Sequence, residues 1–142
     1  MTASREELRK MQESLLKAIL LGQPLQGTMN SVTMPDLHFV TAGGSILLLD
    51  ENLHGPISIA SAERPLQVVG RSMLPAPAGP TGHSAFLRFA PSEVGANSVR
   101  MTLEARMLPS ASGTDLGLSN VQIEFTKVGN EWVAGGPTFS AV

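Results

Sequence analysis

The stretch from Asn97 to Ala134 alternates between apolar and polar residues along two long segments. Successive side chains of a β-strand point to opposite faces, so a period of two predicts strands with one apolar and one charged face. Such strands are typical of an antiparallel sheet that covers a core on one side and faces solvent on the other. The alternating apolar residues are Val99, Met101, Leu103, Ala105 and Met107, then Val121, Ile123 and Phe125.

A helix is predicted over Ser4–Leu21, because apolar residues recur there at helical spacing. Ser4 and Glu7 have the spacing of a capping box, and Gly22 followed by Pro24 predicts the helix end. We expect the apolar side of this helix to pack on the sheet. Its members are Leu8, Met11, Leu15, Leu16, Ile19 and Leu20. Two ion pairs are expected on the polar side, Glu6–Lys10 and Glu13–Lys17.

Shorter strands are predicted elsewhere, separated by turn-forming residues. Gly43-Gly44 and Gly129-Asn130 are expected to form tight hairpin turns. Prolines and glycines crowd the segment 72–82, which predicts a loop. A further turn is expected over 91–97 and a connection over 110–117. The predicted short strands cover 36–41, 45–49, 57–60, 66–69, 84–89 and 132–134, and Phe139 is expected to pin the tail.

These patterns together predict one α+β domain over residues 1–142. The N-terminal amphipathic helix, about 4–21, packs on a curved, mainly antiparallel β-sheet of about six to eight strands. The β-rich region covers about 36–140 and includes the Pro/Gly-rich loop 72–82. A helix-covered half-barrel of the cystatin-like kind is one form of this fold. A β-sandwich with an appended helix is the alternative.

The composition excludes several classes of function. The chain has no cysteine, which rules out disulfides, thiolate nucleophiles and cysteine-bound metal centres. Ten basic residues are scattered and the net charge is −2, so we expect no nucleic-acid partner. The N-terminus has no apolar signal core and no apolar run is long enough to span a membrane, which predicts a cytoplasmic protein without a membrane partner. No sequence motif indicates a cofactor.

Two pairs of residues are candidates for chemistry. Asp36 and His38 lie on one face of a predicted strand, where a carboxylate could orient an imidazole and raise its basicity. Asp50 and His54 lie in a short polar run that could also offer metal ligands. We interpret His38 as a strand residue with a local hydrogen bond and Asp50–His54 as turn chemistry, and we expect no metal site.

The two faces of the predicted sheet suggest two further kinds of site. The apolar face and the helix could enclose a small apolar ligand, in a pocket lined by Leu15, Ile19, Met101 and Leu103. On the polar face of the predicted sheet, charged residues are expected to form solvent-exposed ion pairs between strands. These are Arg100, Glu104, Arg106, Glu124 and Lys127.

Three functions remain open from the sequence. The leading hypothesis is a non-enzymatic binding or assembly module that self-associates, because catalytic motifs are absent while the architectural pattern is strong. The alternatives are a carrier of a small apolar ligand and an enzyme that uses Asp36/His38 or Asp50/His54. The substrate, the ligand and the protein partner are not indicated by any motif.

Overall fold

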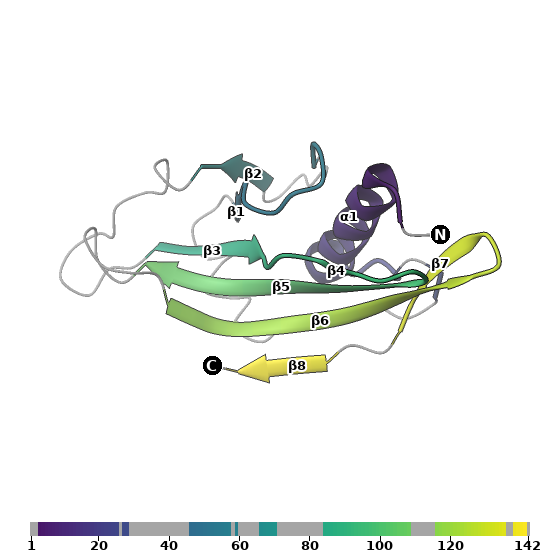
Figure 1. The fold of residues 1–142 in the computed structure, drawn as a ribbon. Helices are drawn as coiled ribbons and strands as arrows, with labels where there is room; N and C mark the ends of the chain where they lie inside the picture. Colours follow the sequence, from purple (N-terminus) through teal and green to yellow (C-terminus); the bar gives the residue numbers. More distant parts are fainter. Residues whose placement is uncertain are drawn as a thin grey trace.

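The structure is a computed structural model that describes residues 3–25, 27–28, 46–57, 59, 66–70, 84–108, 116–135 and 138–141. One helix lies against a curved mixed sheet that forms a half-barrel (Figure 1). The elements in chain order are α1 (Arg5–Leu21), β1 (Ile46–Leu49), β2 (Leu66–Val69), β3 (Ser84–Phe89), β4 (Glu93–Val94), β5 (Ser98–Leu108), β6 (Leu116–Val128), β7 (Glu131–Ala134) and β8 (Thr138–Ala141). The predicted α+β class is confirmed.

The sheet is built around the long antiparallel pair of β5 and β6. Its strand order is β2-β1-β3-β5-β6-β7, with β4 pairing with β5 and β8 pairing with β6. β1 runs parallel to both of its neighbours, β2 and β3, and the remaining pairs are antiparallel. The register of β5 against β6 shifts between Ala105 and Arg106. Such a bulge bends a strand and contributes to curvature.

Helix α1 begins and ends where the sequence predicts. Ser4 and Glu7 form the reciprocal capping box, and Gly22 ends the helix in the left-handed conformation with φ of 71°. The ion pairs differ from the expected ones, because Arg9 lies between Glu6 and Glu13 and binds both. A guanidinium with several donors can bind two carboxylates at once, whereas each lysine offers one ammonium.

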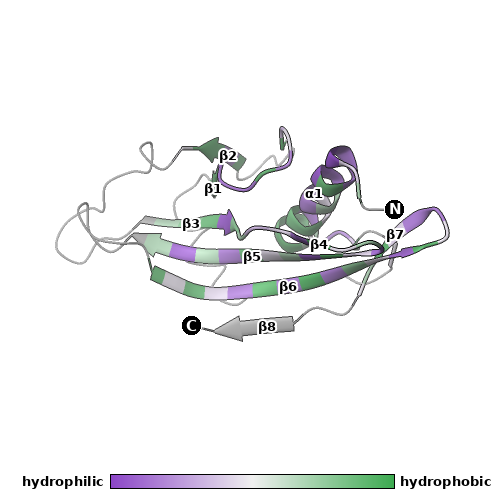
Figure 2. Cartoon of the chain, viewed as in Figure 1, coloured by the Kyte–Doolittle hydropathy of each residue, from purple (hydrophilic) through white to green (hydrophobic). Residues whose placement is uncertain are grey.

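The hydrophobic core lies between α1 and one face of the sheet. Leu15 and Leu16 of the helix and Met101, Leu103 and Phe125 of the long strands are fully buried in it. The alternation of hydropathy along β5 and β6 is visible as bands in Figure 2, with the opposite face of these strands largely polar. We call that opposite face of β5 and β6 the outer face. The predicted apolar side of the helix is thus packed on the predicted apolar face of the sheet.

Several local predictions are corrected. Two short strands were not expected: β4 falls within the predicted turn 91–97, and β8 is formed by the tail. Ile57 and Ile59 are not in a strand, although 57–60 was predicted to be one. Strand β6 begins at Leu116, inside the predicted connection 110–117. The predicted strand 36–41, the turn Gly43-Gly44 and the loop 72–82 lie outside the described residues.

Lys127 was assigned to the wrong face of the sheet. It pairs with Trp132 across β6 and β7, and its ammonium lies 5.7 Å from the centre of the indole ring. Trp132 is 3% exposed and belongs to the core. Lys127 therefore projects on the helix side, where the lysine and the ring make a cation–π contact.

Among the described residues, no helix is long and apolar enough to cross a bilayer.

Candidate functional site

The outer face carries three neighbouring uncharged polar side chains at the middle of the sheet. Thr102 on β5 lies opposite Gln122 on β6, and Glu104 lies opposite Asn120 in the next pair on that face. Side chains of directly paired residues on one face are neighbours in space. Thr102, Asn120 and Gln122 are half-buried, and within the described part of the chain none of the three makes a side-chain hydrogen bond. Within the described part of the chain, no side chain therefore occupies their hydrogen-bonding groups.

These three side chains line a depression of about 300 Å³ on the outer face. The segment between β3 and β4 forms one wall through Ala90 and Pro91. The charged residues Glu93, Arg100 and Glu104 complete the lining. The volume is at the lower end of the range for small-molecule sites. We call this feature the outer-face depression.

The charged side chains around the outer-face depression form ion pairs with one another or with neighbouring residues. Arg100 binds Glu93 at 3.1 Å and Glu124 at 3.6 Å. Arg88 binds Glu104 and Glu51, each at 2.9 Å. Burial lowers the pKa of Arg88, but the hydrogen bonds that Arg88 donates to Glu51 and Glu104, together with their negative charges, outweigh it and the pKa is raised. The charged groups are thus held in place, while the amides and the hydroxyl have no partner in the part of the chain that the structure describes.

A second polar cluster lies in the loop after β1. The His54 Nε2 atom is 2.9 Å from the Ser92 hydroxyl, and both side chains are half-buried. Burial, followed by the positive charge of Arg5, lowers the pKa of His54. The imidazole is therefore neutral near pH 7, and its Nε2 atom can accept the proton of a hydroxyl.

The backbone around His54 is fixed by side chains from other elements. The Gln12 side chain is fully buried; its Oε1 accepts from the His54 N–H and its Nε2 donates to the Asn52 carbonyl, each at 3.0 Å. Arg5 Nε donates to the His54 carbonyl at 2.8 Å. Asn52 has a positive φ of 63°, and its amide donates to the Phe89 carbonyl at 2.8 Å. Left-handed residues of this kind persist where the surroundings hold them in place.

We expect the free energy of unfolding to fall as the pH is lowered from 7.5 to 5.5, because His54 becomes protonated. The pKa of His54 in the folded protein is below that of the unfolded chain, so the unfolded state binds more protons in this range. The contribution of His54 to the free energy of unfolding is complete above about pH 6.5, the ordinary pKa of histidine. It is lost as the pH falls toward the pKa of His54 in the folded protein. Urea denaturation at both pH values should show a larger loss for the wild type than for His54→Gln. An equal loss in both proteins would contradict the expectation.

The other residues singled out from the sequence lie in different surroundings. Asp50 is exposed at the end of β1, and within the described residues no hydrogen bond joins it to His54. Asp36 and His38 lie outside the described residues. The four residues expected to line an apolar pocket, Leu15, Ile19, Met101 and Leu103, belong to the packed core, with Ile19 7% exposed and the other three fully buried.

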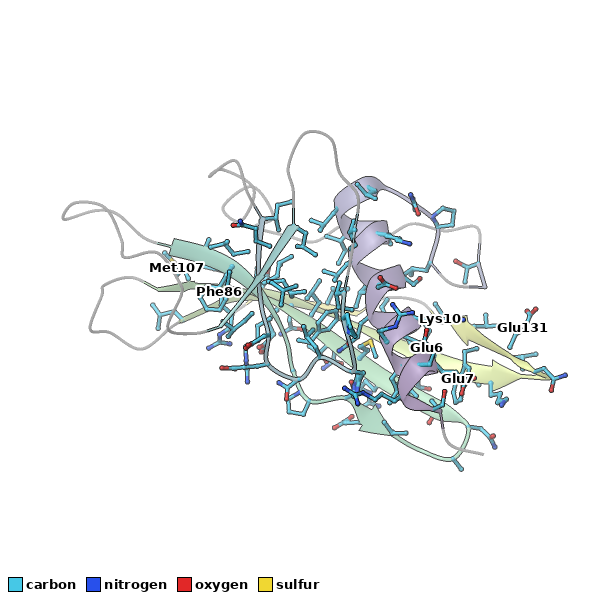
Figure 3. All side chains as sticks on the ribbon, turned by 90° about the horizontal axis from the view of Figure 1, so that it is seen from above. Glu6, Glu7, Lys10, Phe86, Met107 and Glu131 are labelled. Carbon is cyan, nitrogen blue, oxygen red and sulfur yellow. The ribbon has the colours of Figure 1, made fainter. Side chains whose placement is uncertain are left out.

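A groove separates the first half of α1 from the hairpin of β6 and β7. It has a volume of about 390 Å³ and is lined by Glu7, Lys10, Gly27, Asn130, Glu131 and Trp132. The indole of Trp132 donates to Glu7 at 2.8 Å across it. Figure 3 shows Glu6, Glu7 and Lys10 on the part of α1 near the hairpin, with Phe86 and Met107 toward the other end of the sheet. This hydrogen bond connects the helix to the hairpin, so we interpret the groove as part of a structural contact between them.

Comparisons with known proteins add no assignment. The chain matches no known protein family, no curated protein and no solved structure. Within the described residues, no group of three or more histidine or acidic side chains converges as a metal site. The candidate sites therefore depend on the geometry alone.

Sequence reasoning missed Ser92 and Gln12, and it did not single out Thr102, Asn120 and Gln122. Ser92 has no periodic pattern around it, and its partner His54 is 38 positions away. Gln12 occurs beside the apolar positions of the helix, where a polar residue facing the core is the available signal. The alternating pattern of the sequence includes the three outer-face residues. Only the structure shows that, within its described part, their side chains have no hydrogen-bond partner.

Proposed function

We propose that the protein is a binding module that holds a small, uncharged, hydroxyl-rich ligand in the outer-face depression. The observation that carries the proposal is the row formed by Thr102, Asn120 and Gln122, whose side chains have no hydrogen-bond partner among the described residues. An amide offers donors and an acceptor, and a hydroxyl offers both, so the three groups match the hydroxyls of a saccharide. The charged neighbours are paired with each other, which favours a ligand without net charge.

The test uses named probes on the isotope-labelled protein. We expect glucose, galactose, mannose or N-acetylglucosamine to shift the side-chain amide signals of Asn120 and Gln122 in NMR spectra. A shallow polar site of this size suggests a Kd of about 1 mM, equivalent to about −4 kcal/mol. If none of the four sugars shifts these signals at 50-fold excess over that value, roughly 50 mM, the proposal is wrong.

A paired set of variants separates ligand contacts from general effects. Replacing both Asn120 and Gln122 by alanine should weaken binding about 5-fold or more, measured on backbone amide signals, since each lost hydrogen bond contributes about 0.5–1.5 kcal/mol. Thr126→Ala is the matched control, because Thr126 is on the same strand but does not line the depression. Binding that is unchanged in the double variant would place the ligand elsewhere.

Self-association, also expected from the sequence, is proposed as a separate property. Strand β2 ends the strand order at one side of the sheet, and its Val68 is 42% exposed. Among the described strands β2 is paired on one side alone, and an edge strand is a common surface for pairing between chains. Sedimentation of the wild type and Val68→Lys should show a dimer that the charged variant loses. A monomer at every concentration would reject this proposal without affecting the first one.

A further inference from the structure

We propose that Ser92 is a nucleophile activated by His54, and that this pair reacts with small carboxylic esters. The inference goes beyond the proposed ligand binding, because it concerns different side chains and a different chemistry. Its basis is the contact between the His54 Nε2 atom and the Ser92 hydroxyl at 2.9 Å. That distance is the one required between a nucleophile and its general base.

The position of His54 is fixed before any ligand arrives. Gln12 binds the Asn52 carbonyl and the His54 N–H on the N-terminal side of His54, and Arg5 binds the His54 carbonyl on the other side. A general base is effective when the surrounding structure fixes its geometry, because no reorganisation is then needed during the reaction. Three parts of the chain, α1, the loop after β1 and the segment between β3 and β4, converge on this one pair.

The electrostatic setting suits a reaction that develops negative charge. The ring of His54 is neutral near pH 7, as its lowered pKa indicates, so it can accept the hydroxyl proton. The positive charge of Arg5 acts on the same ring. Arg5 Nε donates to the His54 carbonyl, so its positive charge lies beside this residue, and a guanidinium that reaches the carbonyl oxygen of a bound ester would stabilise the oxyanion formed on attack. Both Ser92 and His54 are half-buried, so each keeps part of its surface in contact with solvent.

The reaction requires only the ester and water. The Ser92 oxygen bonds to the carbonyl carbon while its proton passes to Nε2 of His54. The bond to the alcohol oxygen then breaks, and the leaving alcohol takes the proton from His54. A water molecule, deprotonated by His54, attacks the acyl-serine. The carboxylic acid leaves and the proton returns to Ser92, so the sum is ester plus water giving acid plus alcohol.

The first experiment identifies the nucleophile in the unmodified protein. A fluorophosphonate probe should label Ser92, with the Ser92 oxygen bonding to phosphorus, fluoride leaving and the hydroxyl proton passing to His54. Mass spectrometry of the digested protein locates the adduct and needs no variant. Labelling that is absent, or that falls only on other residues, would overturn the proposal.

The second experiment measures hydrolysis of 4-nitrophenyl acetate by release of nitrophenolate. We expect Ser92→Ala and His54→Gln each to lower the protein-dependent rate at least 10-fold, with Ser98→Ala as a serine control that retains it. Ser92→Ala retains the imidazole, so an undiminished rate in that variant would show direct attack by histidine and overturn the proposal. Thermal melting checks that each variant is folded.

Arg5 gives a readout that a merely structural contact would not change. The rate should fall with decreasing pH as His54 is protonated, and Arg5→Gln should move this inflection to higher pH. The same variant should also slow the reaction through the lost cation. An inflection that does not move would remove Arg5 from the site. The sugar titrations do not involve this pair, so the two proposals fail independently.

Discussion

Replacing Phe125 by alanine is expected to lower the free energy of unfolding by about 3–5 kcal/mol. The Phe125 side chain is fully buried in the core, and its strand neighbours in the register are Val99 and Ala134. Removing the ring loses its transfer free energy and leaves a cavity that the rigid sheet cannot close. The loss is a large part of the roughly 5–15 kcal/mol that stabilises a domain. Urea denaturation followed by circular dichroism measures it.

Val128→Ala is the matched control for the change at Phe125. Val128 is on the same strand but is 62% exposed, so its truncation should change the free energy by less than about 0.5 kcal/mol. Similar losses in both variants would mean that the helix does not cover this face of the sheet in solution.

Replacing Gln12 by methionine is expected to cost about 2–4 kcal/mol, although the new side chain has similar length. The change leaves the His54 N–H and the Asn52 carbonyl without their partner. Each unsatisfied buried polar group costs about 1–3 kcal/mol. Urea denaturation gives the loss, and hydrogen exchange should show faster exchange at the His54 amide.

Lys10→Met is the control for the helix as a whole. Lys10 is exposed on the same helix, so this variant should lose little stability and leave the His54 amide protected. If Gln12→Met were as stable as Lys10→Met, the two hydrogen bonds would contribute nothing net, and the proposed fixing of His54 would be wrong.

The sequence predicted the parts of the fold that repeat a local pattern. Alternation located β5 and β6, and the capping residues Ser4 and Gly22 located the ends of α1. The correct face for Lys127 was also available, since it has the same parity as Phe125. The parallel pairing of β1 with β2 and β3 was not available, because pairing joins distant segments and leaves no local pattern.

The candidate sites were less predictable than the fold, because each depends on contacts between separate elements. His54 was singled out with Asp50, whereas its hydrogen-bond partner in the structure is Ser92. The polar residues of the outer face were recognised as a wet surface, but sequence alone does not show which are paired. Among the described residues Arg100 and Glu104 have partners while Asn120 and Gln122 have none, and that difference distinguishes a solvated face from a candidate site.

The hydrogen bond between Glu7 and Trp132 has a consequence for the synthesis of the chain. The two residues are 125 positions apart, so the helix leaves the ribosome long before its partner strand exists. Translation adds about 5–20 residues per second, so the hairpin that completes the cover of α1 is made roughly 6–25 s after the helix. During that interval the core that fully buries Leu15 and Leu16 in the folded protein is incomplete. Until the hairpin is made, the apolar side of α1 is therefore a binding surface for a ribosome-associated chaperone.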